Sequence, residues 1–241
     1  MQLPTAPVCL GILFATVAVA RAQEAYFATG AGGGLRDREV WQATTYTPFG
    51  TLDDPGPVAR AVGTYVDFQY DTALPDDPDA RITVTGWKAL AEVGWQWRVL
   101  GGKVAAFAGA AAQEYALAPA DPGSDLAGFQ LSASLSATAD IPLPLHDVHL
   151  AGDLTWTPQM GELWVAVRPG YDLGEGWRIG PEAALSQGPD YQFIRVGVFT
   201  SGYRFATFGR TFFLGGEAGV SDEPGSFQPF PYAAVWLGTK F

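Results

Sequence analysis

Apolar and polar residues alternate with a period of two along most of the chain, and this pattern constrains the fold more than any other feature. In residues 128–140 leucine, alanine and phenylalanine alternate with serine, glutamine and threonine. Successive side chains of a strand point to opposite faces, so this segment would have one apolar and one polar face. Residues 81–98 repeat the pattern with tryptophans on the apolar face. No segment shows the three-to-four-residue apolar spacing of an amphipathic helix.

The alternating segments predict an all-β protein. They number about twelve, of roughly 10 residues each, and an even number is typical of bacterial single-chain membrane barrels. The chain has 30 glycines and 8 tryptophans, and only 16% of its residues are charged. We therefore predict a transmembrane antiparallel up-and-down β-barrel whose apolar faces touch lipid. Its strands are expected at residues 25–33, 39–47, 59–71, 81–98, 103–117, 128–140, 148–156, 162–172, 178–185, 194–201, 211–220 and 231–241.

The last segment, Pro231 to Phe241, is expected to close the barrel. It ends on an aromatic residue in mid-strand and resembles the C-terminal signal by which outer-membrane barrels are recognised for assembly. Its strand would pair with the first one, because an open edge in lipid leaves backbone groups unpaired. With this end in the periplasm, Gly50 to Pro57 becomes an unusually long periplasmic turn. The acidic connections fall outside the cell, near Asp76, Asp121, Asp190 and Asp222.

Residues 1–22 are predicted to be a cleaved secretory signal peptide, and residues 23–241 the barrel. Val8 to Ala20 is a short apolar run, and Ala20-Arg21-Ala22 has the small-x-small pattern of a cleavage site. The run is shorter than the roughly 20 residues of a membrane-spanning helix. The only cysteine, Cys9, lies inside it, so the mature chain would have no thiol. These features predict a protein of the bacterial outer membrane, with membrane lipid as its surroundings.

The charge distribution excludes one class of partner. The chain carries 14 basic and 25 acidic residues, and no cluster of lysine or arginine that would bind nucleic acid. Two histidines and no mature cysteine make a poor transition-metal site, and we expect neither a metal nor a cofactor.

Charged residues on the polar faces of the strands are predicted to point into the lumen. Two interpretations remain open. The charges could pair with one another and tie the strands together. Alternatively, they could line a narrow polar pore for a sugar polymer, with Tyr65, Phe213 and Trp236 as stacking surfaces for pyranose rings. The predicted inward set comprises Asp67, Lys88, Glu92, Asp153, Glu162, Arg168, Arg178, Glu182, Arg195 and Glu217.

An enzymatic alternative depends on His149. This residue lies on a polar face beside Asp153, and Ser132, Ser134 and Ser136 lie on the neighbouring strand. Histidine, serine and a carboxylate could form a lipid-hydrolysing site of the phospholipase or lipid A deacylase type. No motif surrounds these serines, and we expect no catalytic residues. A purely structural barrel is the third possibility.

Three stretches resemble the BcsS-type cellulose biosynthesis proteins of alphaproteobacteria. Residues 115–129 are an acidic, proline-containing loop before a Gly-Phe strand start. Residues 180–197 are a Gly-Pro-Glu strand, a polar turn and an arginine-containing strand, and residues 50–71 are an early turn before an aromatic-rich strand. The resemblance implies an outer-membrane barrel that supports cellulose or exopolysaccharide production as a channel, docking site or anchor. Its implied partners are cellulose or a related polysaccharide and other cellulose-synthesis proteins; it implies no catalytic residues.

Overall fold

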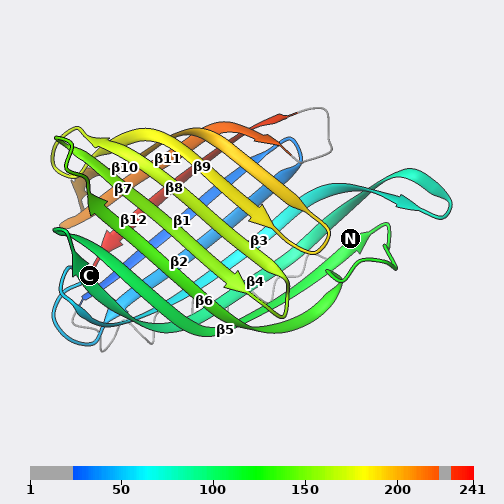
Figure 1. Ribbon diagram of the computed structural model, residues 1–241, viewed down its shortest axis with the longest axis horizontal. Helices are drawn as coiled ribbons and strands as arrows, with labels where there is room; N and C mark the ends of the chain where they lie inside the picture. The colour runs from blue at the N-terminus through cyan, green and yellow to red at the C-terminus, as the bar shows by residue number, and fades with distance from the viewer. Residues whose placement is uncertain (1–23, 223–228) are drawn as a thin grey trace.

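A computed structural model describes residues 24–222 and 229–241 and shows a closed antiparallel β-barrel (Figure 1). The predicted signal peptide lies outside the described residues. No helix in the described ranges is long and apolar enough to cross a membrane. The strands are β1 (Glu24–Gly34), β2 (Asp37–Thr47), β3 (Gly56–Leu74), β4 (Asp77–Val99), β5 (Gly102–Ala118), β6 (Gly128–Pro142), β7 (Val148–Thr157), β8 (Glu162–Asp172), β9 (Arg178–Gln187), β10 (Gln192–Thr207), β11 (Arg210–Asp222) and β12 (Phe230–Lys240).

The barrel closes where β12 pairs with β1, as the sequence predicts. Their register runs from Tyr26 opposite Lys240 to Gly34 opposite Tyr232. Two further backbone bonds extend this seam to the last residue, because Ala25 N donates to Phe241 O and Phe241 N donates to Ala25 O. The final segment therefore completes a ladder without an open edge. We call the end of the barrel where β1 starts and β12 finishes the terminal end, and the opposite end the loop end.

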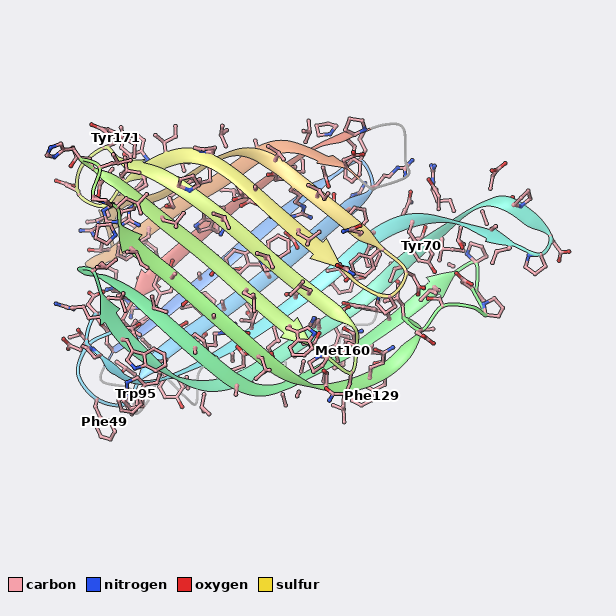
Figure 2. All side chains as sticks on the ribbon, viewed as in Figure 1. Phe49, Tyr70, Trp95, Phe129, Met160 and Tyr171 are labelled. Atoms are coloured by element: carbon pink, nitrogen blue, oxygen red, sulfur yellow. The ribbon has the colours of Figure 1, made fainter. Side chains whose placement is uncertain are left out.

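The outer surface is apolar between two rings of aromatic residues. Val93 is 69% exposed and Leu131 is 65% exposed on this surface. Trp95 and Tyr171 project outward near the terminal end, and Phe129 projects outward near the loop end (Figure 2). An apolar band between aromatic girdles is what a barrel needs to contact acyl chains and headgroups.

β3 and β4 are longer than the other strands and extend beyond the loop end. β2 pairs with β3 only as far as Phe68, and β5 pairs with β4 only as far as Thr83. The rest of the hairpin projects as a two-stranded ribbon (Figure 1). Asp71 accepts hydrogen bonds there from Arg81 Nε at 2.8 Å and from Arg36 Nη1 at 2.9 Å. These cations, Arg81 first, lower the pKa of Asp71 below its usual value.

Candidate functional site

The interior of the barrel gathers nearly all the charged residues that the sequence assigns to it. Cross-strand partners lie on the same face of a sheet, so the register shows which residues share the lumen. All nine of the predicted lumenal charges from Lys88 to Glu217 lie on this inner face. Each of them forms an ion pair with a residue of another strand. The nine residues are Lys88, Glu92, Asp153, Glu162, Arg168, Arg178, Glu182, Arg195 and Glu217.

Glu92 on β4 is almost fully enclosed, at 3% exposure. Its Oε2 accepts a hydrogen bond from Arg60 Nε at 2.5 Å. Its Oε1 accepts from Ser134 Oγ at 2.6 Å and from Ser136 Oγ at 2.7 Å. The Arg60 guanidinium also lies 4.5 Å from the centre of the Phe107 ring. One carboxylate thus connects β3, β4 and β6 across the lumen.

Glu162 forms a second centre nearer the loop end. Lys88 Nζ donates to its Oε2, and Tyr191 OH donates to its Oε1 at 3.3 Å. The carboxylate is buried and lies at the first residue of β8. It therefore connects β4 to β8 and to the loop before β10.

Arg168 on β8 is the hub of a third centre. Its Nε donates to Glu182 Oε2, and its Nη1 donates to Asp153 Oδ2 at 2.8 Å. Its Nη2 lies 3.5 Å from Glu217 Oε2. Tyr232 OH donates to the other oxygen of Glu182 at 3.3 Å. The single guanidinium is surrounded by carboxylates from β7, β9 and β11.

Two further arginines pair with residues that the sequence analysis missed. Arg178 Nη1 donates to Asp140 Oδ1 at 2.7 Å, and Arg195 Nη2 donates to Asp37 Oδ2 at 2.6 Å. Arg195 also lies 3.7 Å from Glu39. Asp140 continues the serine face of β6, so its inward direction was readable from the alternation. Asp37, Glu39 and Arg60 lie on strands whose faces the alternation does not distinguish.

Tyr65 and Asp67 do not line the lumen, and this prediction is wrong. Both belong to the opposite face of β3 from Arg60, and Tyr65 is 38% exposed opposite Val40 and Trp87. At the loop end the usual polarity reverses. The interior there is packed with apolar rings, and the outer wall carries polar residues.

Phe213 and Trp236 do face the lumen, but both rings pack against the wall. Phe213 meets Tyr26 edge-on, with ring centres 6.1 Å apart. Trp236 lies over Gly215, where an added Cβ would come within 2.3 Å of the indole. Both side chains are half-buried, so wall contacts cover part of the ring surface on which a pyranose would stack.

The loop end of the lumen is filled by a cluster of buried side chains. Leu126, from the β5–β6 connection, is 1% exposed within it. The same connection is fixed by two hydrogen bonds, from Tyr70 OH to Asp121 at 2.9 Å and from Ser124 Oγ to Asp190 at 2.6 Å. We call this cluster the loop-end plug: Phe68, Tyr70, Ile82, Val84, Tyr115, Leu126, Phe193 and Phe230.

The terminal end is covered by the long β2–β3 turn. Leu52 of this turn is 7% exposed. Its carbonyl accepts from Gln96 Nε2 at 2.9 Å, and its N–H donates to Glu24 Oε2 at 2.5 Å. Asp53 accepts from Lys103 Nζ at 2.7 Å, which lowers the pKa of the Asp53 carboxyl. The unusual length of this turn is explained by its contacts inside the mouth of the barrel.

The structure does not assemble the hydrolase site. His149 lies opposite Pro142, while Ser136 lies opposite Thr155, a separation of about 20 Å at about 3.4 Å per residue. His149 Nδ1 lies 3.4 Å from Asp140, and Ser134 and Ser136 donate to Glu92. Among residues 24–222 and 229–241, no group of three or more metal-ligating side chains comes together.

A sequence profile decides the family. The profile described as cellulose biosynthesis protein BcsS matches residues 13–235. The chain belongs to this family. The resemblance seen in three stretches thus extends over nearly the whole chain, and a BcsS-family chain of this kind is a cellulose-related barrel.

Solved structures similar to the BcsS-family chain include other barrels. A KdgM porin has 9% identity and a TM-score of 0.35, with 90% of this chain and 99% of that chain covered. OmpT, an outer-membrane protein of Vibrio cholerae, has 10% identity and a TM-score of 0.35, covering 91% and 97%. The outer-membrane protease OmpT of Escherichia coli has 10% identity and a TM-score of 0.29, covering 91% and 93%. No curated protein matches the chain.

Proposed function

We propose that this protein supports cellulose production as a closed docking or anchoring barrel of the outer membrane, and not as the channel for the polymer. The filled lumen carries the proposal. A buried apolar cluster occupies one end, the β2–β3 turn enters the other, and arginine–carboxylate centres join the walls between them. A glucan chain would have to displace all three, whereas a surface role leaves them intact.

The membrane location rests on the apolar exterior between its aromatic rings, together with the family. Residues 1–22 would direct the chain across the inner membrane and then be cleaved, which leaves residues 23–241 as the barrel. Mass spectrometry of the protein from isolated outer membranes tests both points. A mature mass that begins near Gln23 supports cleavage. Recovery of the protein in the soluble fraction without detergent would overturn the membrane location.

The closed lumen is tested by electrical recording in planar bilayers. The wild-type barrel is expected to show no steady conductance. A stable wild-type conductance that cello-oligosaccharides block would refute the closed barrel and restore the channel interpretation.

The cellular role is tested by deleting the gene and measuring cellulose at the cell surface by dye binding. Loss or mislocalisation of cellulose, restored by the wild-type gene, is expected. Unchanged cellulose and unchanged attachment of the polymer to the cell would refute a role in its production.

A further inference from the structure

One part of the barrel wall is incomplete at the loop end. β7 pairs with β6 only between Leu135 and Pro142, so the first half of β6 has no strand on that side. On its other side this half pairs with β5 from Gly128 onward. The N–H of Ala133 points into the gap, because it donates to Gln159 Oε1 at 2.7 Å. The period of two places the N–H and C=O groups of Leu131 and Phe129 toward the same gap.

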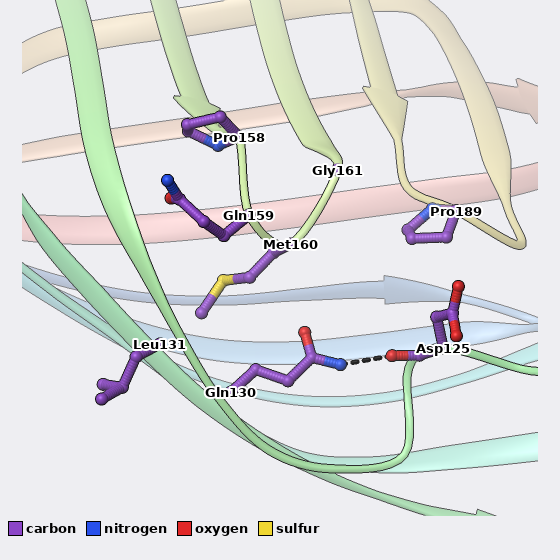
Figure 3. Close-up of a pocket in the computed structure, with 8 residues that line it drawn as sticks. All are labelled: Asp125, Gln130, Leu131, Pro158, Gln159, Met160, Gly161 and Pro189. Carbon is purple, nitrogen blue, oxygen red and sulfur yellow. Dashed lines mark hydrogen bonds between the residues drawn. The ribbon is translucent and has the colours of Figure 1, made fainter.

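A groove of about 560 Å³ lies along this free edge (Figure 3). Its walls come from the start of β6, the β7–β8 loop, and the connections before β6 and β10. Met160 at its base is buried, whereas Leu131 and Gln159 are exposed. The lining residues are Asp125, Gln130, Leu131, Pro158, Gln159, Met160, Gly161 and Pro189.

The polar groups of the groove are held in place by the protein. Gln159 Oε1 accepts from both Ser132 Oγ and Ala133 N, each at 2.7 Å, which leaves its Nε2 directed away from these bonds. Gln130 Nε2 donates to the backbone carbonyl of Asp125. Within the described part of the chain, the Asp125 carboxylate receives no hydrogen bond and forms no ion pair. The groove thus presents an amide donor, a carboxylate acceptor and backbone groups of both kinds.

The position of the groove along the barrel axis restricts which ligands can fill it. Phe129 lies beside Trp87, with ring centres 6.4 Å apart, so the edge lies at the outer aromatic ring. At that level the edge meets headgroups and water, so a ligand that displaces the water must satisfy the unpaired backbone groups in its place. The occupant must both donate and accept hydrogen bonds. It must also be uncharged or cationic, because the groove has a carboxylate and no lysine or arginine in its lining.

We propose that this groove binds a short segment of an uncharged β-glucan chain. The inference rests on the proposed function, because the glucan would be the ligand of the docking barrel. Each hydroxyl can donate to Asp125 or a backbone carbonyl and accept from Gln159 Nε2 or a backbone N–H. The exposed side chain of Leu131 can contact an apolar pyranose face at the rim of the groove. Phosphorylated or uronic-acid polymers are repelled by Asp125.

Cellohexaose titrated into the detergent-solubilised full-length barrel, followed by saturation-transfer NMR and calorimetry, tests the proposal. Binding is expected, and Asp125→Ala and Gln159→Ala are each expected to weaken it about tenfold, the equivalent of about 1.4 kcal/mol. Asp76→Ala, an exposed carboxylate on the β3–β4 hairpin, is the matched control and should bind as wild type. A comparison of heated and unheated samples by gel electrophoresis checks that each variant is folded, because a folded barrel and its unfolded chain migrate differently.

Three results would overturn the proposal: absence of cellohexaose binding at millimolar concentration, equal binding by all three variants, or stronger binding of trigalacturonate. A free strand edge can also accept a peptide strand. Binding of a synthetic valine–threonine repeat peptide without cellohexaose binding would replace the glucan with a polypeptide partner. The proposed function is judged separately. If deletion abolishes surface cellulose and the groove variants restore it fully, only the groove inference fails.

Discussion

Glu92 offers the sharpest test of the interior network. Replacing it with alanine removes the partner of Arg60 and leaves the hydroxyls of Ser134 and Ser136 without their acceptor. Removing one member of a buried ion pair costs about 3–5 kcal/mol, because the remaining charge is uncompensated. The Arg60 side chain keeps 15% exposure and its contact with Phe107, so we expect the lower part of this range.

A loss of about 3 kcal/mol corresponds to roughly a hundredfold change in the unfolding equilibrium. Urea unfolding of the barrel in lipid vesicles, followed by tryptophan fluorescence, measures it, and the midpoint should fall while the slope stays constant. Glu114→Ala is the matched control. Glu114 lies exposed on the outer face of the adjacent strand β5, and its loss should change stability by about 0.5 kcal/mol or less.

The double variant Arg60→Ala/Glu92→Ala separates pairing from simple truncation. Because neither charge remains alone, its cost should be smaller than the sum of the single costs by about 0.5–3 kcal/mol. If Glu92→Ala loses less than about 1 kcal/mol, or if the two single costs simply add, the carboxylate does not hold the lumen together and the argument from buried pairing is refuted.

Three further predictions follow from other parts of the barrel. Ala91→Arg places a charge in the middle of the outer band and should cost about 2–4 kcal/mol in vesicles; a cost of about 0.5 kcal/mol, as on a water-exposed surface, would contradict lipid contact. Leu126→Ala should cost about 2–5 kcal/mol by leaving a void in the loop-end plug, and an unchanged urea midpoint would show that this residue is not packed there. Lys103 holds the pKa of Asp53 below its usual value, so the stabilisation of the β2–β3 turn is complete above about pH 4 and is lost as the pH falls through the lowered pKa. Proteolysis of this turn should therefore rise in acid, and Lys103→Met should reduce that pH dependence.

The inward and outward faces of most strands were predictable because one physical rule governs them. Where the outside is lipid and the inside is polar, the alternation in β4, β6 and β9 identifies both faces. The rule failed at Tyr65 and Asp67. Along β3 both faces carry apolar residues. Near the loop end the interior is apolar and the outer wall is polar, the reverse of the rest of the barrel. Phe68 is buried in the plug there, whereas Arg38 on the outer wall is exposed. The polarity of a side chain therefore cannot assign it to the inner or outer face at the loop end, where the inside is apolar and the outside is polar.

The candidate site divides in the same way. The sequence predicted nine of the charges that enter the lumen and missed Asp37, Glu39, Arg60 and Asp140. It could not predict that Arg168 gathers three carboxylates, because that convergence depends on the stagger of the strands and on the reach of the side chains. It also identified the long β2–β3 turn without a reason for its length. No sequence pattern indicated the groove beside β6, because the groove exists only where β7 stops pairing with β6.

The sequence by itself determined the strand number, the closure by the last segment and the side on which most residues lie, because these depend on local alternation and turn residues. Only the tertiary structure decided which charges meet, that both ends of the lumen are filled, and where one strand edge is left free. Those properties depend on the stagger between neighbouring strands, which the period of two does not encode.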